Sequence, residues 1–210
     1  PGDGCVAALP QDVQTVFLRN TVREELEDAG VRPESLPFDL GGLYDRHPYD
    51  LSGGEQQLLG LAKVLAASPR LLLLVGPTKG LGAVGGNQVY DTFRTVREQY
   101  RAGFLVITHD LLLARKFCDR IVVMYCGRIL ETNTARELFE HPRHPYTQGL
   151  IASLPHLGMR PMAGFSPAFT HQPAGCVFHP RCPHARERCR LEEPGELCLG
   201  EGRVACHGCT

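Results

Sequence analysis

The sequence predicts an α/β fold, a sandwich built around a mostly parallel sheet, and three observations support it. Unbroken apolar runs at 71–75 and 104–108 are typical of strands that are buried on both faces of a parallel sheet. Segments with apolar residues at helical spacing lie between and beside these runs. Strands that alternate with helices favour parallel pairing, because each helix carries the chain back to the start of the next strand.

The first half of the chain contains these elements in alternating order. Thr21 and Glu24 predict a capping box, in which each side chain accepts a backbone N–H of the other residue, so a short helix begins here. The segment 30–48 is rich in turn formers and predicts little regular structure. The other expected elements are a strand at 5–10, a helix at 54–67, a strand at 71–75, a helix at 88–100 and a strand at 104–108.

The second half is expected to begin with a helix at 111–117 and a hairpin that turns about Cys126-Gly127. A second capping box is predicted at Thr134 and Glu137.

From His141 onward, proline and histidine become frequent and apolar periodicity fades. We therefore expect a boundary near Leu157, with one domain at 1–157 and a small, loop-rich appendage at 158–210. Such an appendage has too little core to fold without a cross-link.

Composition and charge narrow the class of protein. The chain has 43% hydrophobic and 21% charged residues and a net charge of -1, so nothing favours nucleic acid or an anionic membrane surface. No apolar run reaches about 18 residues, and Arg70 interrupts the best candidate, so we expect no membrane span and no signal peptide. The chain opens without Met, and we expect it to be a fragment.

The segment Leu51-Ser-Gly-Gly-Glu-Gln-Gln57 opens the predicted helix at 54–67. Serine and two glycines at a helix N-terminus form an anion site, because backbone N–H groups point outward and glycine lets a phosphate approach closely. Taken alone, the same residues also fit a plain serine N-cap beside a glycine turn.

The order of motifs around this segment resembles the ABC ATPase family from about 8 to 131. The shared features are LSGGEQQ, a helix, Pro69, four leucines, Pro77-Thr78 and Leu105-Val-Ile-Thr-His-Asp110. The expected fold is therefore part of the P-loop NTPase sandwich of ABC type.

The resemblance implies roles for individual residues. Ser52, Gly53, Gly54 and Glu55 match the signature motif, which grips the γ-phosphate of ATP held by a partner domain. His109 matches the switch histidine that contacts the γ-phosphate. Gln11 matches the Q-loop glutamine, which senses Mg²⁺ and the transmembrane subunit, although Gln14 follows closely.

The chain departs from the family pattern at two places. No G-x-x-x-x-G-K-[ST] phosphate loop occurs, and in the family it would lie upstream of Pro1. The strand after the signature normally ends in Asp-Glu, but here Val75 and Gly76 stand there, and Gly82 replaces the D-loop aspartate. Because neither Val75 nor Gly76 can hold Mg²⁺ or act as a base, this chain alone is expected not to hydrolyse ATP.

A second glycine pattern, Gly80-Leu-Gly-Ala-Val-Gly85, matches the dinucleotide motif G-x-G-x-x-G. The preceding strand ends at Val75, and four residues including Pro77 intervene, whereas the motif requires an immediate tight turn. NAD binding is therefore the weaker alternative.

Cysteine is concentrated at the end of the chain. Six of the nine cysteines lie after position 175: Cys176, Cys182, Cys189, Cys198, Cys206 and Cys209. Without a secretory signal, reduced thiols are expected, and clustered thiolates favour a metal. The spacing C-x5-C-x6-C-x16-C suits either a tetrahedral Zn²⁺ site or an iron–sulfur cluster.

The segment 141–207 resembles the C-terminal extension of dipeptide, oligopeptide and nickel importer ATPases, through His144-Pro-Tyr-Thr147 and G-C-x-F-H-P-R-C-P. The resemblance implies a [4Fe–4S] cluster held by Cys176, Cys182, Cys189 and Cys206, with Zn²⁺ as the alternative. Cys206-x2-Cys209 leaves another fourth ligand open. The middle of the chain resembles cobalt-type, energy-coupling-factor ATPases instead.

These resemblances imply an ATP-binding subunit, or a piece of one, of an ABC importer for peptides or metal ions. It would lie peripherally on the cytoplasmic face of the membrane. Its partners would be a second ABC ATPase domain, with which it shares ATP and Mg²⁺, and transmembrane permease subunits. The alternative is a non-catalytic assembly module in which the metal is a structural cross-link.

Overall fold

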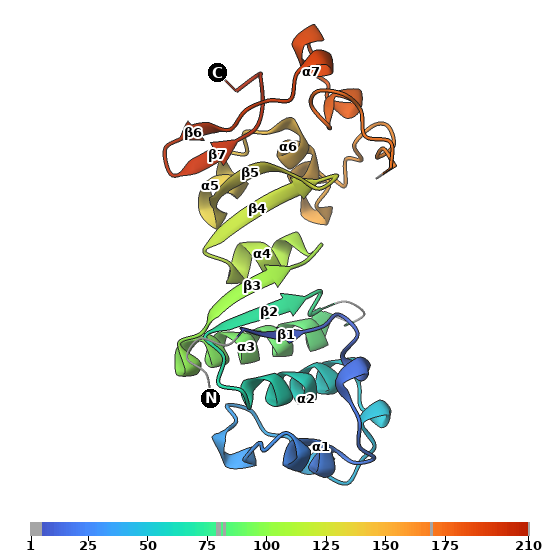
Figure 1. Ribbon diagram of the computed structural model, residues 1–210, viewed down its shortest axis with the longest axis vertical. Coiled ribbons are helices and arrows are strands. Elements are labelled where there is room, and N and C mark those ends of the chain that lie inside the picture. Colours follow the sequence, from blue (N-terminus) through green and yellow to red (C-terminus); the bar gives the residue numbers. More distant parts are fainter. Residues whose placement is uncertain (1–5, 79–80, 82, 169, 210) are drawn as a thin grey trace. The chain divides into compact units, whose positions relative to one another are not determined.

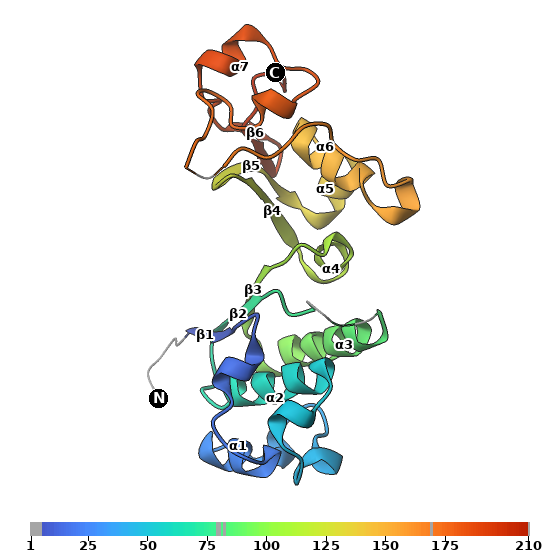
Figure 2. The same cartoon turned by 90° about the vertical axis from the view of Figure 1, so that its right-hand side faces the viewer.

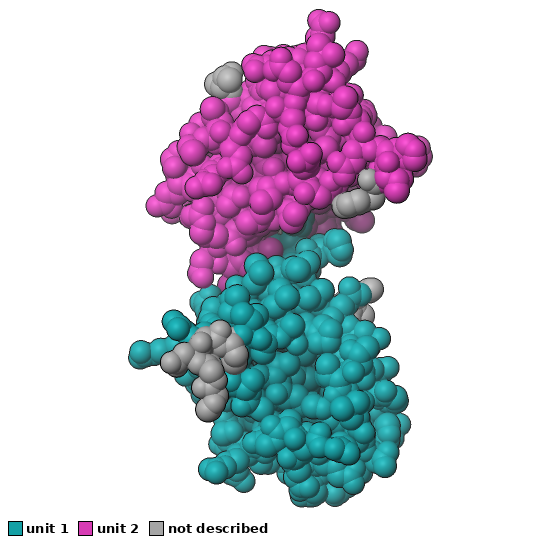
Figure 3. All heavy atoms as spheres, in the orientation of Figure 1, with its two compact units in different colours: residues 1–113 teal, residues 114–210 magenta. Residues whose placement is uncertain are grey.

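The computed structural model describes residues 6–78, 81, 83–168 and 170–209, in two compact units, 1–113 and 114–210 (Figure 3). None of the described helices combines the length and the apolar character that crossing a membrane requires.

The first unit is built on a three-stranded parallel sheet in the order β1-β2-β3 (Figure 1). Its elements are β1 (Val6–Leu9), β2 (Leu71–Val75), β3 (Gly103–Ile107), α1 (Val22–Asp28), α2 (Gly53–Leu65) and α3 (Ala83–Tyr100). The predicted parallel pairing is confirmed. The register sets Leu9 opposite Leu74, and Leu74 opposite Val106.

Helices α2 and α3 pack together on one face of this sheet (Figure 2). Leu72, Leu74 and Phe93 are almost completely buried there. A Cβ at Gly60 would lie 2.9 Å from Cδ1 of Leu9, so the absence of a side chain at Gly60 lets α2 approach β1 closely.

The opposite face of the sheet corrects the expectation that these strands are buried on both sides. Val6, Leu105 and Ile107 are 62%, 54% and 55% exposed, and burial in β3 alternates along the strand. An apolar run indicates that both faces of a strand can be buried. Whether a face is buried depends on another element that packs against it, and the run does not predict such an element.

The first helix begins as predicted. Thr21 and Glu24 form the complete capping box, and α1 ends at Asp28. The segment 30–48 contains only short 3₁₀ turns, η2 (Pro33–Ser35), η3 (Gly41–Leu43) and the start of η4 (Pro48–Asp50). Another 3₁₀ turn, η1 (Val13–Val16), follows β1.

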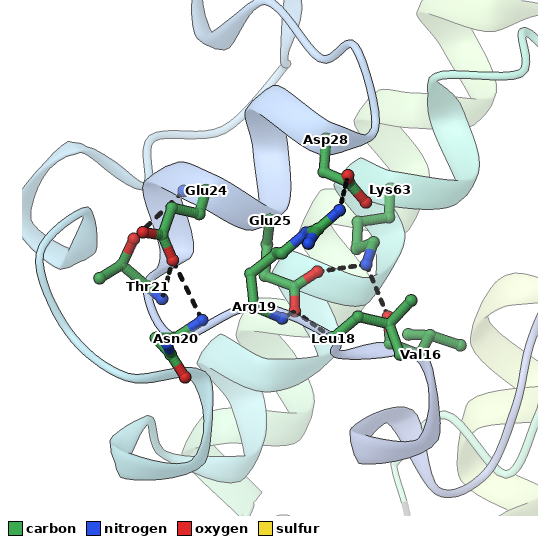
Figure 4. A network of polar contacts seen from close by, with 9 residues as sticks. All are labelled: Val16, Leu18, Arg19, Asn20, Thr21, Glu24, Glu25, Asp28 and Lys63. Atoms are coloured by element: carbon green, nitrogen blue, oxygen red, sulfur yellow. Dashed lines mark hydrogen bonds and ion pairs between the residues drawn. The ribbon is translucent and has the colours of Figure 1, made fainter.

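A buried ion pair ties α1 and the preceding loop to α2 (Figure 4). The carboxylate of Glu25, completely buried, accepts from the backbone N–H groups of Leu18 and Arg19 and from Nζ of Lys63. Nζ of Lys63 also donates to the carbonyl of Val16 over 2.6 Å. One lysine on α2 therefore holds both ends of the segment 16–25.

The second unit contains an antiparallel sheet in the order β4-β5-β7-β6. Its elements are α4 (Leu111–Phe117), which begins in the first unit, β4 (Arg120–Tyr125), β5 (Arg128–Thr134), α5 (Ala135–Glu140), α6 (Pro145–Ala152), η5 (Pro155–Leu157), η6 (His179–Arg181), α7 (Glu187–Leu191), β6 (Leu197–Leu199) and β7 (Gly202–Val204). The predicted hairpin is confirmed: Cys126 and Gly127 both have positive φ, 47° and 79°, as a tight hairpin turn requires.

The predicted capping box at Thr134 is half formed. Its hydroxyl accepts from the N–H of Glu137 over 3.3 Å and caps α5, but the reciprocal bond from Glu137 is absent among the contacts of the described residues.

The end of the chain is more ordered than its sequence pattern predicts. β7 pairs with β5, and a hydrophobic cluster joins Tyr125 and Leu130 to Cys176, Val177, Phe178 and Cys189. The predicted boundary near Leu157 falls inside this compact unit and stays a prediction.

We predict that Lys63→Met destabilises the first unit by about 3 kcal/mol, because it leaves the Glu25 carboxylate buried without its cation. Urea denaturation measures the change. Adding Glu25→Gln to Lys63→Met should recover part of the loss. Arg19→Met, which removes the exposed ion pair with Asp28, is the control and should have no measurable effect. A loss for Lys63→Met no larger than for Arg19→Met would contradict this account.

Candidate functional site

A cavity of about 350 Å³ lies at the carboxyl ends of the three parallel strands. It is lined by Gln11, Val75, Gly76, Thr78, Ile107, Thr108, His109 and Asp110. Four residues predicted from widely separated motifs, Gln11, Val75, Gly76 and His109, therefore come together. Gln11 lines this cavity, whereas Gln14 donates to Oε1 of Gln56 on α2 over 3.3 Å.

The backbone conformation of Gly76, which forms one wall of the cavity, disfavours a side chain. The N–H of Gly76 donates to the carbonyl of Ile107 over 2.7 Å, and the φ of Gly76 is +54°. A Cβ here would lie 3.1 Å from Cγ of Gln11. A carboxylate side chain at position 76 would thus require the Gln11 side chain to give way, in addition to the strain of a positive φ.

The wall beside His109 is held by the aspartate that follows it. Oδ1 of Asp110 accepts from the N–H groups of Leu112 and Leu113, both over 3.0 Å, and so caps α4. Oδ2 of Asp110 accepts from the hydroxyl of Tyr90 on α3 over 2.9 Å. The exposed imidazole of His109 therefore sits on a fixed turn at the rim of the cavity. Asp110 lies in a motif that resembles the ABC ATPases, but no role was predicted for it from the sequence.

The residues Ser52, Gly53, Gly54 and Glu55 form the N-terminus of α2, and none of them lines this cavity. The N–H of Ser52 donates to Oε2 of Glu55 over 2.7 Å, and Oγ of Ser52 accepts from the N–H of Glu55 over 3.4 Å. Hydrogen bonds from the side chain of Ser52 and from its backbone N–H to the carboxylate lower the pKa of Glu55. Ser52 and Gly53 are exposed, and no atom lies within 4 Å of a Cβ built on Gly54.

The helix end is thus capped and open, as an anion site requires. Gly82, predicted at the D-loop, lies outside the described residues, as do two of the residues of the dinucleotide pattern, Gly80 and Gly82.

A second cavity, of about 310 Å³, lies within the second unit and is lined by five thiols. They belong to Cys176, Cys182, Cys189, Cys206 and Cys209. The four predicted ligands are therefore brought to one place, and Cys209 joins them. Cys198 is exposed and does not line the cavity.

The thiols are shielded from water to different degrees. Burial raises the pKa of Cys176 and of Cys182, and the neighbouring cysteines raise both further. Among the described residues, no group of three or more His, Cys, Asp or Glu side chains could hold a metal ion as placed. Metal binding here would need thiolates, so it would release protons and strengthen as the pH rises.

A buried imidazole also lines the thiol cavity. His144 is 1% exposed, and its Nδ1 accepts from the N–H of Tyr146 over 3.0 Å, which places the proton of the neutral ring on Nε2. That Nε2 is buried without a hydrogen-bond partner among the described residues. Burial lowers the pKa of His144 to about 4, so the ring is neutral at pH 7. A buried N–H donor without an acceptor fits a site for an acceptor ligand.

The chain is similar in sequence to known transport proteins. A family model described as "Oligopeptide/dipeptide transporter, C-terminal region" matches residues 130–189. The di/tripeptide transport ATP-binding protein DppF of Pseudomonas aeruginosa is 36% identical over 195 residues, which cover 90% of this chain and 58% of that protein. The dipeptide transport ATP-binding protein DppD of Escherichia coli is 37% identical over 175 residues, 80% of this chain and 54% of that protein.

A solved structure shares the fold. It is cbiO1 from Clostridium perfringens, described as part of the ABC transporter complex cbiONQ, with a TM-score of 0.55 and 20% identity. The match covers 73% of this chain and 65% of that one, and at this identity it supports the fold alone. The chain spans a little over half the length of the two peptide-transport relatives it matches.

We predict that the second unit loses stability in acid through His144. Between pH 6.5 and 4 the unfolded chain binds a proton that the folded chain excludes, so about 3 kcal/mol of stability is lost as the pH falls through this window. His144→Asn keeps an acceptor for the N–H of Tyr146 and should remove the dependence; His141→Asn, an exposed histidine, should not. Urea midpoints of metal-free protein at pH 7.5 and 4.5 measure it. An equal fall of the urea midpoint between pH 7.5 and pH 4.5 in the wild type and in His144→Asn would contradict the prediction.

Proposed function

Because the chain belongs to the ABC transporter ATPases and corresponds to their C-terminal region, we propose that it acts in the ATP-binding subunit of a peptide importer. The observation that carries the proposal is the cavity in which Gln11, Val75, Gly76 and His109 meet at the sheet edge. Ligands of α/β sheets bind at the carboxyl ends of parallel strands, where this cavity lies.

The open N-terminus of α2 supports a role in an ATP site that two polypeptides build together. Ser52 and Gly53 are exposed and Gly54 has open space around it, so the amides of the two glycines can reach a phosphate from outside, while the N–H of Ser52 is held by Glu55. We infer that Ser52, Gly53, Gly54 and Glu55 close a nucleotide whose phosphate loop belongs to a second ABC ATPase domain. ATP and Mg²⁺ would be shared between the two.

The cavity on this chain itself lacks an acid–base group at the two decisive positions. Val75 and Gly76 carry no carboxylate, so they can neither order Mg²⁺ nor polarise water, and the positive φ of Gly76 disfavours a side chain at that position. His109 and Gln11 line the same cavity and would contact a γ-phosphate there. We therefore propose that this chain supports hydrolysis on a partner rather than at its own cavity. The absence of a carboxylate at positions 75 and 76 also favours the second candidate function, a non-catalytic assembly module.

Cargo and location follow from the relatives. DppF and DppD are named as peptide-transport proteins, so we propose peptides rather than metal ions as the cargo. Transmembrane permease subunits would be the other partners, with this chain held peripherally at the cytoplasmic face of the membrane.

We predict that Gly54→Asp abolishes this support while leaving the fold intact. A carboxylate here repels phosphate, whereas at a helix N-terminus it stabilises the helix by about 0.3–1 kcal/mol. With an intact ABC ATPase whose own signature serine has been replaced, the wild-type chain should raise ATP turnover. Gly54→Asp should reduce that gain about 100-fold.

Gly42→Asp is the matched control, since it adds the same charge at another open, exposed glycine and should keep the full gain. No gain from the wild-type chain, or an equal gain from Gly54→Asp, would reject the proposal.

For the thiol cavity we propose a [4Fe–4S] cluster held by Cys176, Cys182, Cys189 and Cys206, with Zn²⁺ as the alternative. Two observations support a ligand of several atoms. These four thiols, together with that of Cys209, line one cavity of about 310 Å³, although no group of described residues could hold a single ion as placed. The neutral imidazole of His144 presents an unpaired N–H, and a cluster sulfide would accept it.

Reconstitution with ferrous iron and sulfide in the absence of oxygen tests this assignment. The wild-type chain should gain broad visible absorbance and retain iron through gel filtration, because four thiolates can ligate the cluster. Cys182→Ser should lose both signals, and Cys198→Ser, the exposed control, should keep both. A colourless protein that retains zinc would favour the alternative, and retention of neither metal would contradict a metal site.

A further inference from the structure

Five cysteines line the thiol cavity, one more than the four ligands proposed for the cluster. The fifth, Cys209, lies three residues after Cys206. Cys206 and Cys209 both line the cavity, in the segment that follows β7. Cys198, the remaining cysteine of this region, is exposed and apart from it. The sequence therefore contains a Cys-x-x-Cys pair with a control cysteine nearby.

The backbone folds back at this pair. The N–H of Gly208 donates to Sγ of Cys206 over 3.4 Å, and a Cβ on Gly208 would lie only 3.7 Å from that sulfur. Sγ of Cys209 donates to the carbonyl of Arg143 over 3.3 Å. This turn holds both sulfurs on the same side, toward the same cavity.

The two thiols also interact directly, through a hydrogen bond between their side chains. In a Cys-x-x-Cys pair whose thiols face one cavity, one thiol can attack a disulfide and the other can resolve the mixed disulfide that forms.

We propose that Cys206 and Cys209 form a disulfide by exchange with a low-molecular-weight disulfide such as oxidised glutathione. The Cys206 thiolate attacks one sulfur of oxidised glutathione, forms a mixed disulfide and releases one glutathione thiolate. Cys209 gives its proton to that thiolate or to water, attacks Sγ of Cys206 and releases the second glutathione. Two protein thiols are oxidised, and one glutathione disulfide is reduced to two thiols.

This step has a consequence for the metal, which rests on the proposed cluster. A disulfide consumes Cys206, so the bonded pair and a metal held by Cys206 exclude each other. The disulfide itself needs no metal, and it is tested in metal-free protein, so its failure and the failure of the cluster are separate results.

Peptide mass spectrometry of the full chain tests the inference. Reduced, chelator-treated protein is equilibrated with mixtures of reduced and oxidised glutathione, alkylated and cleaved with trypsin. Cleavage after Arg203 separates Cys206 and Cys209 from Cys198. The peptide that begins at Val204 should resist alkylation and weigh two hydrogen atoms less than its reduced form, under conditions in which Cys198 is still alkylated or carries glutathione.

Variants decide between a pair and independent thiols. Cys209→Ser should abolish the disulfide and leave glutathione on Cys206, because the variant lacks the adjacent thiol that resolves the mixed disulfide. Cys198→Ser should form the disulfide as the wild type does. A doubly alkylated peptide in the wild type, glutathione on both cysteines, or a disulfide that joins Cys206 to another cysteine would each overturn the inference.

Discussion

Parallel pairing of β1, β2 and β3 is the constraint on which the candidate nucleotide site depends. Because the strands run in one direction, residues that follow each of them meet at one edge of the sheet, although Gln11 and His109 lie almost a hundred positions apart. The register fixes their heights, with Leu9, Leu74 and Val106 in one row. A slip of one strand by one residue would turn the side chains that face α2 and α3 to the opposite face and would dismantle the cavity.

The thiol cavity likewise depends on contacts between segments that are far apart in the chain. The N–H of Cys176 donates to the carbonyl of Cys189 over 2.9 Å, and both cysteines are buried in the cluster around Phe178. Cys206 arrives from another direction, because β7 pairs with β5 and ends at Val204. Hydrophobic packing and strand pairing thus bring the thiols together through contacts of the protein alone.

Much of this was predictable from local patterns. Capping pairs, apolar runs and the Cys126-Gly127 turn located their elements, since each depends on contacts within a few residues. The order of motifs located Gln11, His109 and the signature residues. The open face of the sheet, the pairing of β7 with β5 and the unpaired Nε2 of His144 were not predictable, because each depends on contacts between residues far apart in the chain. Three-residue strands such as β6 and β7 are too short to show a period.

The proposed function depends on closure of the capped N-terminus of α2 around a nucleotide carried by another polypeptide. Sedimentation velocity of the chain mixed with an intact ABC ATPase that cannot hydrolyse ATP tests this closure. We expect a one-to-one complex that forms with ATP and Mg²⁺ and dissociates when the nucleotide is removed. Two separate species at every ATP concentration, or a complex indifferent to nucleotide, would contradict it.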